Sequence, residues 1–351
     1  MSGRAIFLLP PFEKSGLGHF YRSLVLQLEN QPKDSLKVFF PFKNIKLIKT
    51  QNEIHPCAHI ISSKKFVNFV SDEQKTVLIL DISTLLTFKY IRYYQKLLFE
   101  AKKYDVRIIM IDSIGKEAFC PFFQNLFTDL VVPYAVDEKS LSDHFLACKN
   151  VLHGSDFVVL NKSSFYTGNR AFANLKKQKS EHVYKIGIKL GGVPLEETKR
   201  LCEILSKFIG AKKIELQVYL ASEDNSQNQK ILQNILKKNS NVKIIFSQEH
   251  FHQLKNNTLC DYWFVGSGLT KYEAYENKLE FCVVLSSEEK FSMNKGFQTL
   301  SGSDHLKLYS PKQSGSFLMH LFMKPNSKRK YKFNYRYSFK GPKKIGNLIY
   351  A

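Results

Sequence analysis

Apolar, strand-like segments alternate with helical segments along this 351-residue chain, and this alternation constrains the fold more than any other feature of the sequence. The strand-like runs are continuous and rich in β-branched and aromatic residues, which is typical of parallel strands covered on both faces. A first series places strands at 5–9, 38–40, 76–80, 106–111, 130–132 and 157–160, and helices at 19–28 and 84–103. These elements predict one doubly wound α/β domain.

A second series of the same kind follows a polar, basic stretch. It predicts strands at 184–190, 214–220, 242–246, 263–265 and 281–285, and helices at 195–208, 227–237, 251–256, 269–277 and 294–300. A chain of this length exceeds the usual size of one hydrophobic core, so two domains are expected. We predict domains at 1–165 and 183–305, a linker at 166–182 and a C-terminal tail at 306–351.

The composition, with 44% hydrophobic and 24% charged residues, is that of a folded globular protein. Residues 1–11 lack the apolar core and cleavage site of a signal peptide, and no apolar run reaches the roughly 18 to 20 residues of a membrane-spanning helix. The six cysteines are widely spaced and form no metal-ligand pattern with histidines, which predicts buried free thiols. We therefore expect a cytoplasmic protein that needs neither a metal nor another cofactor.

The net charge of +21 predicts an anionic partner. Residues 305–351 contain eleven Lys or Arg and no Asp or Glu, and aromatic residues occupy every second position from Tyr331 to Phe339. This alternation fits an edge strand, a segment that lies on an anionic membrane surface over 324–344, or a site for single-stranded nucleic acid. No other motif supports nucleic acid, which leaves two alternatives for the tail, an edge strand or a contact with the inner face of a membrane.

A glycine loop, Gly16-Leu17-Gly18-His19, lies between the first predicted strand and the first predicted helix. Ligands bind at this edge of a parallel sheet, and glycines let the backbone approach them closely. His19 stands at the helix start, where a neutral imidazole could take a proton from a hydroxyl or from water. The alternative is a simple turn in which His19 only caps the helix. Since Tyr21, followed by Arg22, stands where a dinucleotide fingerprint needs a third glycine, NAD binding is not predicted.

Two further loops follow strands of the second series. One contains Gly191-Gly192, and the other begins with Gly266-Ser267-Gly268-Leu269-Thr270 and leads to Glu273, one turn into the next helix. Backbone amides and hydroxyls at such junctions can bind phosphate oxygens, and a carboxylate can accept hydrogen bonds from ribose hydroxyls. The two loops predict a nucleotide-diphosphate site. Taken alone, Glu273 could also be a solvated helix residue.

Together these motifs resemble two-domain nucleotide-sugar enzymes of the GT-B fold, especially the UDP-sugar hydrolase of pseudaminic acid synthesis and the spore-coat polysaccharide proteins, and more distantly the murein glycosyltransferase. Residues 16–26 look like the early G-x-G-H-x-x-R-x-L-x-L pattern of this group, and residues 266–273 resemble its G-x-G-x-T-x-x-E segment. The resemblance spans about residues 4–305. It implies two Rossmann-like domains that face a central cleft, with His19 as the catalytic residue. The implied nucleotide-sugar contacts are Gly16, Gly18, Arg22, Gly191, Gly192, Gly266, Ser267, Gly268, Leu269, Thr270 and Glu273.

Departures from the hydrolase pattern concern residues that handle water. The hydrolases usually carry Asp-x-Tyr where this chain has Asp81-Ile82-Ser83, and two aspartates where it has Asp112-Ser113. An Asn-Gln pair of the hydrolases is also replaced, here by Glu289-Lys290. Asp81 and Asp112 could orient the acceptor or His19, or could cap a following helix.

These departures favour transfer of the sugar over its hydrolysis. We predict a metal-independent glycosyltransferase of bacterial surface glycan or glycoprotein assembly, in which His19 is the general base. Its expected partners are a UDP- or CMP-linked sugar donor and a glycan, a lipid-linked or a protein acceptor. The alternative enzyme is a nucleotide-sugar hydrolase of nonulosonic (pseudaminic-type) acid biosynthesis, and the non-enzymatic alternative is a nucleic-acid binder that owes its charge to that role.

Overall fold

The computed structural model divides into two compact units. Unit 1 comprises Met1–Leu160, Lys295–Phe297 and Tyr337–Ala351, and unit 2 comprises Asn161–Asn294 and Gln298–Arg336. The structure describes residues 4–9, 18–31, 36–39, 58–60, 63–71, 76–81, 91–111, 126–135, 148–160, 184–190, 195–209, 214–220, 230, 232, 234, 242–246, 260–277, 279–285, 294–298, 307–309 and 340–350. The predicted linker, 166–182, lies outside these residues, and the predicted domain boundaries stay predictions.

Unit 1 contains a parallel sheet of seven strands in the order β3-β2-β1-β4-β5-β6-β7. The order reverses between β1 and β4, so the chain leaves these two neighbouring strands toward opposite sides of the sheet. Such a switch point is where ligands bind in open α/β sheets. The strands are β1 (Arg4–Leu8), β2 (Leu36–Phe39), β3 (Ala58–Ile60), β4 (Thr76–Asp81), β5 (Arg107–Ile111), β6 (Asp129–Val132) and β7 (Asn150–His153).

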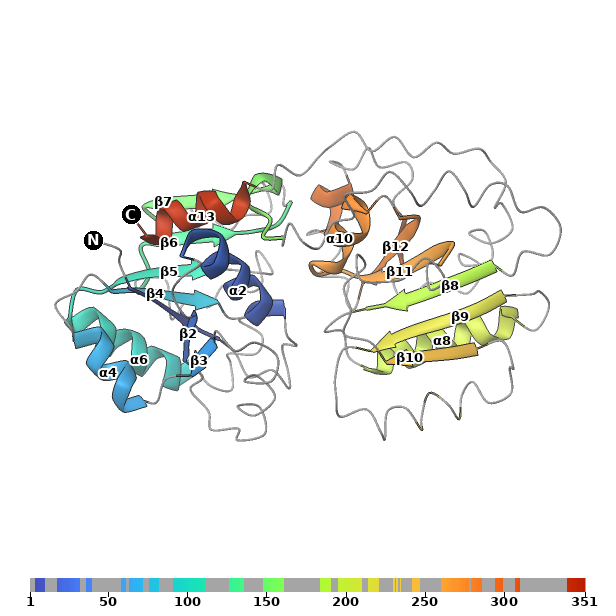
Figure 1. Ribbon diagram of the computed structural model, residues 1–351, viewed down its shortest axis with the longest axis horizontal. Coiled ribbons are helices and arrows are strands. Elements are labelled where there is room, and N and C mark those ends of the chain that lie inside the picture. The colour runs from blue at the N-terminus through green and yellow to red at the C-terminus, as the bar shows by residue number, and fades with distance from the viewer. Residues whose placement is uncertain are drawn as a thin grey trace. The chain divides into compact units, whose positions relative to one another are not determined.

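Successive residues of these strands enter two separate core layers, as strand geometry requires. One layer joins Ile6, Leu8, Leu78 and Leu80 to residues of α4 (Ser63–Ser71) and α6 (Ile91–Lys103). The other joins Ala5, Phe7, Val77 and Ile79 to residues of α2 (Gly18–Asn30) and α13 (Gly341–Tyr350). Helices therefore cover both faces of the sheet, as Figure 1 shows.

The C-terminal helix α13 packs closely on unit 1. A Cβ atom on Gly346 would overlap the side chain of Asn30, and Asn30 Nδ2 donates a hydrogen bond to the carbonyl of Pro342 at 3.0 Å. At the other end of the helix, Tyr350 Oη donates to Gln27 Oε1 at 2.8 Å. The sequence placed this segment in the tail and predicted no helix there.

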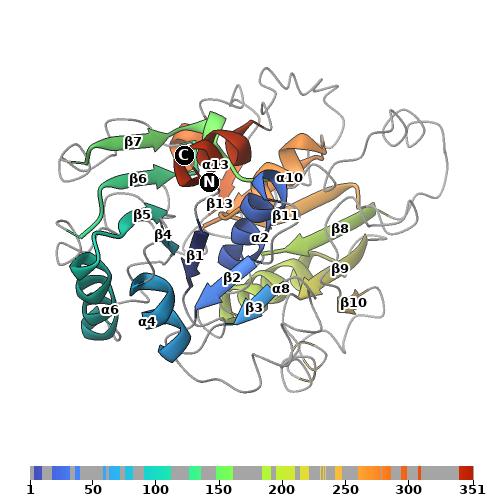
Figure 2. The same cartoon turned by 60° about the vertical axis from the view of Figure 1, so that its left-hand side comes forward.

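Unit 2 contains a second parallel sheet, in the order β10-β9-β8-β11-β12-β13 (Figure 2). Its switch point lies between β8 and β11. The strands are β8 (Tyr184–Lys189), β9 (Ile214–Leu220), β10 (Val242–Phe246), β11 (Tyr262–Gly266), β12 (Phe281–Val284) and β13 (Lys307–Tyr309), and the helices include α8 (Leu195–Ile209) and α10 (Thr270–Glu276). Residues 294–298, between β12 and β13, are also helical, and of these residues 295–297 belong to unit 1.

The expectation of an α/β fold with two doubly wound sheets is confirmed. The strand predicted at 157–160 is wrong: β7 lies at Asn150–His153, a 3-10 turn, η3 (Ser155–Phe157), follows it, and residues 158–160 are buried outside any strand. The apolar side chain of Val159 packs in the core layer that contains residues of α2 and α13. The helix predicted at 251–256 and the aromatic alternation at 331–339 lie outside the described residues, as does most of the helix predicted at 227–237.

Four cysteines lie in the described part of the chain, and all four are free thiols. Cys202, Cys260 and Cys282 are buried, as the sequence predicted, whereas Cys148 is only half-buried. Burial, helped by the charge of Glu203, raises the pKa of the Cys202 thiol to about 12, so this sulfur stays a protonated, unreactive thiol. Among the described residues, no helix is long and apolar enough to span a membrane.

Candidate functional site

The first candidate site lies at the switch point of the unit 1 sheet. Helix α2 follows β1 and begins at Gly18, so it presents His19 at the carboxyl edge of the sheet. Asp81 is the last residue of β4, the strand that pairs with β1. The topology therefore brings together two residues that are 62 positions apart in the sequence. Both side chains are buried, with 7% of His19 and none of Asp81 exposed to solvent.

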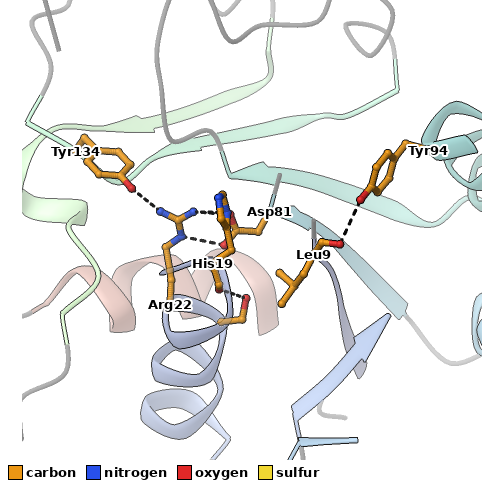
Figure 3. Close-up of polar contacts among 7 residues, drawn as sticks. Leu9, His19, Arg22, Asp81, Tyr94 and Tyr134 are labelled. Atoms are coloured by element: carbon orange, nitrogen blue, oxygen red, sulfur yellow. Dashed lines mark hydrogen bonds and ion pairs between the residues drawn. The ribbon is translucent and has the colours of Figure 1, made fainter. Parts of the chain in front are cut away.

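His19 and Asp81 form a short polar contact, with 2.7 Å between Nδ1 and Oδ1 (Figure 3). Arg22 lies one turn further along α2 and binds the same carboxylate with two nitrogens: Nε donates to Oδ2 at 2.9 Å, and Nη2 donates to Oδ1. Such a two-pronged contact fixes both partners in the plane of the carboxylate. The guanidinium is 2% exposed, so the ion pair is shielded from water.

The ionisation of Asp81 follows from these contacts. Burial alone raises the pKa of this carboxyl, but the charge of Arg22, the neighbouring His19 and their hydrogen bonds outweigh burial and hold the pKa below its ordinary range. Asp81 is therefore a carboxylate that can only accept hydrogen bonds. A carboxylate can only accept, so the 2.7 Å contact with Oδ1 requires a proton on Nδ1, although Arg22 Nη2 also lies 3.1 Å from this nitrogen. In the neutral form of the ring, Nε2 then carries the lone pair. Nε2 has no hydrogen-bond partner among the described residues.

Tyr134 is a member of this cluster that sequence reasoning missed. It follows β6 at the same edge of the sheet, and its hydroxyl accepts a hydrogen bond from Arg22 Nη1 at 2.9 Å. The Arg22 guanidinium carbon also lies 5.9 Å from the centre of the Tyr134 ring. Its position in the sequence was the available signal for a site residue. Tyr134 stands two residues after a predicted strand, and Asp81 stands at the end of another. Figure 3 shows Arg22 between Tyr134 and Asp81.

A second tyrosine fixes the end of β1, where the chain enters the glycine loop. Tyr94 of α6 is almost fully buried, and its hydroxyl donates a hydrogen bond to the carbonyl of Leu9 at 3.2 Å. Gly16 of the loop itself lies outside the described residues, as does Asp112. Their predicted roles in the site stay predictions.

The second candidate site lies at the switch point of the unit 2 sheet. Gly266 is the last residue of β11, and a Cβ atom on it would overlap the carbonyl oxygen of Leu190 at the end of β8. Only glycine fits at this close approach. Gly191 and Gly192, the residues that follow Leu190, lie outside the described residues.

The residues after Gly266 form a turn that leads into α10. Ser267 is buried, Gly268 is exposed, and Leu269, Thr270 and Glu273 are half-buried. The carbonyl of Leu269 accepts hydrogen bonds from the amides of Tyr272 and Glu273, at 2.9 and 3.1 Å, and so starts the helix. Two separate groups of predicted site residues are thus each brought together within one unit. In unit 1 the group is His19, Arg22 and Asp81, and in unit 2 it is the predicted nucleotide contacts from Gly266 to Glu273.

Comparisons with known proteins give structural likeness without sequence likeness. No family model matches the chain, and no curated protein matches it. The chain is similar to the solved structure of UDP-GlcNAc 2-epimerase from Neisseria meningitidis bound to UDP-GlcNAc, at 13% identity over 99% of both chains and a TM-score of 0.57. It is also similar to HepE of Anabaena in complex with UDP and glucose, at 12% identity over 99% of this chain and 95% of that one, with a TM-score of 0.59.

The fold is GT-B. At such low identity the likeness establishes the fold, and it agrees with the two parallel sheets described above. A third structure of the same kind is UDP-GlcNAc 2-epimerase from Methanocaldococcus jannaschii in complex with UDP-GlcNAc and UDP, at 12% identity over 99% of this chain and 100% of that one, with a TM-score of 0.56. The predicted resemblance to the pseudaminic acid pathway group stays a prediction.

The described residues contain no group of three or more His, Cys, Asp and Glu that could hold a metal ion.

Proposed function

We propose that this protein binds a UDP-sugar and transfers the sugar to an acceptor hydroxyl, with His19 as the general base. The observation that carries the proposal is the buried pair of His19 and Asp81 at the switch point of the first sheet, where Nε2 of the ring has no hydrogen-bond partner among the described residues. The bound UDP and UDP-GlcNAc of the structurally similar proteins support the choice of donor.

In the proposed reaction the acceptor oxygen forms a bond to the anomeric carbon of the sugar. Nε2 of His19 takes the hydroxyl proton, and the bond between the anomeric carbon and the phosphate oxygen breaks, so that UDP leaves with the electron pair. The imidazolium that forms is stabilised by Asp81, which accepts the Nδ1 hydrogen bond at 2.7 Å. Arg22 holds this carboxylate in position through its two hydrogen bonds.

In this proposal unit 2 binds the nucleotide. Backbone amides of the turn after Gly266 are suited to bind the diphosphate and to stabilise the charge that develops as UDP leaves. Glu273 is half-buried one turn into α10, where its carboxylate could accept hydrogen bonds from the ribose hydroxyls.

Two other reactions use the same donor. Hydrolysis differs only in that water replaces the acceptor hydroxyl, and the same base serves both. Epimerisation at C2 of the sugar, the activity in the names of two similar structures, needs a proton removed from one face of the carbon and returned to the other. In the described part of unit 1, the His19 cluster presents one proton acceptor, Nε2, which suits transfer or hydrolysis better than epimerisation.

The three reactions separate by product. UDP-sugars and CMP-sugars are incubated with the protein, with and without glycan, lipid-linked or peptide acceptors, and the products are followed by NMR. Nucleotide released only in the presence of an acceptor, together with a glycosylated acceptor, supports the proposal. Free sugar released without an acceptor shows hydrolysis, and accumulation of the C2 epimer shows epimerisation. Either of these two results would contradict transfer.

A further inference from the structure

A fully buried lysine stands next to the turn that follows β11. Lys271 is the second residue of α10 and has no exposed surface. Burying an ammonium group is costly unless its protons are used in hydrogen bonds. This lysine is not among the residues that the proposed reaction uses, so its burial calls for a separate explanation.

The ammonium group binds two oxygens from two different connections of the sheet. Nζ donates to the carbonyl of Ser267 at 2.8 Å, and to Oδ1 of Asn294 at 2.6 Å. Ser267 lies in the turn after β11, and Asn294, itself fully buried, begins the helical residues 294–298 between β12 and β13. Nζ also lies 4.9 Å from the centre of the Tyr272 ring. Lys271 therefore ties together the connections that follow two neighbouring strands.

The bond to Ser267 sets the direction of the next peptide group. The described chain contains no cis peptide bond, and in a trans peptide the C=O and the following N–H point in opposite directions. Because the Ser267 carbonyl points inward to Nζ, the amide N–H of Gly268 points away from the buried ammonium. Gly268 is exposed, and a Cβ atom built on it meets no atom within 4 Å. Gly268 is thus the exposed residue of the turn, and the space on the side of its Cα hydrogens is open.

We propose that Lys271 is a positioning residue for the phosphates of a nucleoside diphosphate. It holds the turn at Ser267 and Gly268 in the form that directs an amide donor outward, and it adds a fixed positive charge beneath the turn. This role rests on the proposed function, because the ligand it serves is the nucleotide of the sugar donor. It predicts that Lys271 acts on the phosphate part of the ligand and leaves recognition of the nucleoside unchanged.

The test compares Lys271→Met with the wild-type protein by calorimetric titration of uridine, UMP and UDP. Methionine keeps the length of the side chain and removes its charge and donors. We expect the affinity for UDP to fall about 10- to 100-fold and the affinity for uridine to stay within about twofold, as a lost charge-assisted hydrogen bond to the loop implies. Lys230→Met is the matched control for loss of one positive charge, since Lys230 is an exposed residue of unit 2.

The phosphate dependence separates positioning from a purely structural role. Equal losses for uridine and UDP, or no loss for either, would overturn the role of Lys271. If Lys271→Met does not fold, Asn294→Ala provides the second variant, because it removes one acceptor of Nζ and leaves Ser267 in place. For this variant we expect the affinity for UDP to fall less than in Lys271→Met, and the affinity for uridine to stay unchanged. An equal fall in the affinity for uridine would count against the proposal. If the wild-type protein binds no uridine nucleotide, the proposed function itself fails, which is a different result.

Discussion

At the scale of single residues, the unit 1 site depends on one carboxylate that serves two partners. Asp81 orients His19 and neutralises Arg22, and all three side chains are buried. Removing either partner of a buried ion pair leaves an uncompensated charge, so substitutions at Asp81 or Arg22 are expected to cost about 3 to 5 kcal/mol of stability. Loss of activity in such variants therefore cannot separate folding from catalysis. His19 is the better position for a test.

We expect His19→Ala to fold and to lose about 10²- to 10⁴-fold in kcat, because it removes the proton acceptor while the pair of Asp81 and Arg22 persists. The measurement is kcat and KM for the nucleotide-sugar, with a thermal unfolding curve for each variant. UDP affinity should change little. His153→Ala, at a half-buried histidine of β7, is the matched control and should keep wild-type kcat. Full activity in His19→Ala would show that another residue is the base.

The sequence predicted His19 and Asp81 as candidates, because a glycine loop and a strand end are recognisable from local residue patterns. That the two side chains meet could not be predicted, since it depends on the pairing of β1 with β4. Arg22 was predicted as a ligand contact, and the structure shows its guanidinium bound to Asp81 and Tyr134. Tyr134 carried no pattern of its own and was missed.

At the scale of elements, the position of β11 against β8 depends on a glycine. A side chain at residue 266 would overlap the carbonyl of Leu190, whereas residue 268 has open space around it. We expect Gly266→Ala to lower the free energy of unfolding by about 1 to 3 kcal/mol, as overpacking does. Gly268→Ala should lower it by less than about 0.5 kcal/mol. Urea denaturation of both variants checks this difference, and equal stabilities would mean that β8 and β11 are not held this closely.

A second element-scale feature is a polar cluster around Asp129 that joins three strands and the C-terminal helix. Arg107 of β5 donates to Asp129 at 2.8 Å and also to the carbonyl of Leu348 in α13 at 2.8 Å. Thr128 and Asn150 donate to the same carboxylate. Burial raises the pKa of Asp129, but hydrogen bonds from Arg107, Asn150 and Thr128 outweigh it and lower the pKa below its ordinary value of 3.8.

This lowered pKa predicts how stability depends on pH. A carboxylate whose pKa is lower in the folded than in the unfolded chain stabilises the fold above the unfolded value, and this contribution is lost as the pH falls through the folded pKa. The free energy of unfolding of the wild-type protein should therefore fall more steeply below about pH 4 than that of Asp129→Asn. Urea titrations between pH 3 and pH 7 measure both slopes. Asp156→Asn is the control and should keep the wild-type slope, because Asp156 is exposed and its ion pair with Lys344 lies at the surface, where such pairs contribute little to stability.

Most strands could be predicted, because continuous apolar runs such as 76–80 and 106–111 carry their own signal. Helix α13 could not: Gly341, Pro342 and Gly346 give its ten residues a low intrinsic helix propensity, and it forms against α2 and the 156–158 turn. Strand β3 has three residues, too few for a pattern to show. In both cases tertiary packing decides the structure.

At the scale of the whole molecule, the two units repeat one design, a parallel sheet with a switch point at which the chain presents functional groups. The net charge of +21 agrees with an anionic partner, and a nucleoside diphosphate is such a partner. The predicted contact of 324–344 with an anionic membrane stays a prediction, since residues 324–339 lie outside the described part of the chain. The central claim is that the protein binds a nucleotide-sugar.

The most direct measurement is a calorimetric binding screen of the wild-type protein against UDP, CMP, ADP and GDP. We predict saturable binding with a preference for the uridine or cytidine nucleotide. We also predict that the ligand raises the free energy of unfolding, by about 2.7 kcal/mol at a ligand concentration 100 times Kd. If none of the four nucleotides binds, the assignment as a nucleotide-sugar enzyme is wrong.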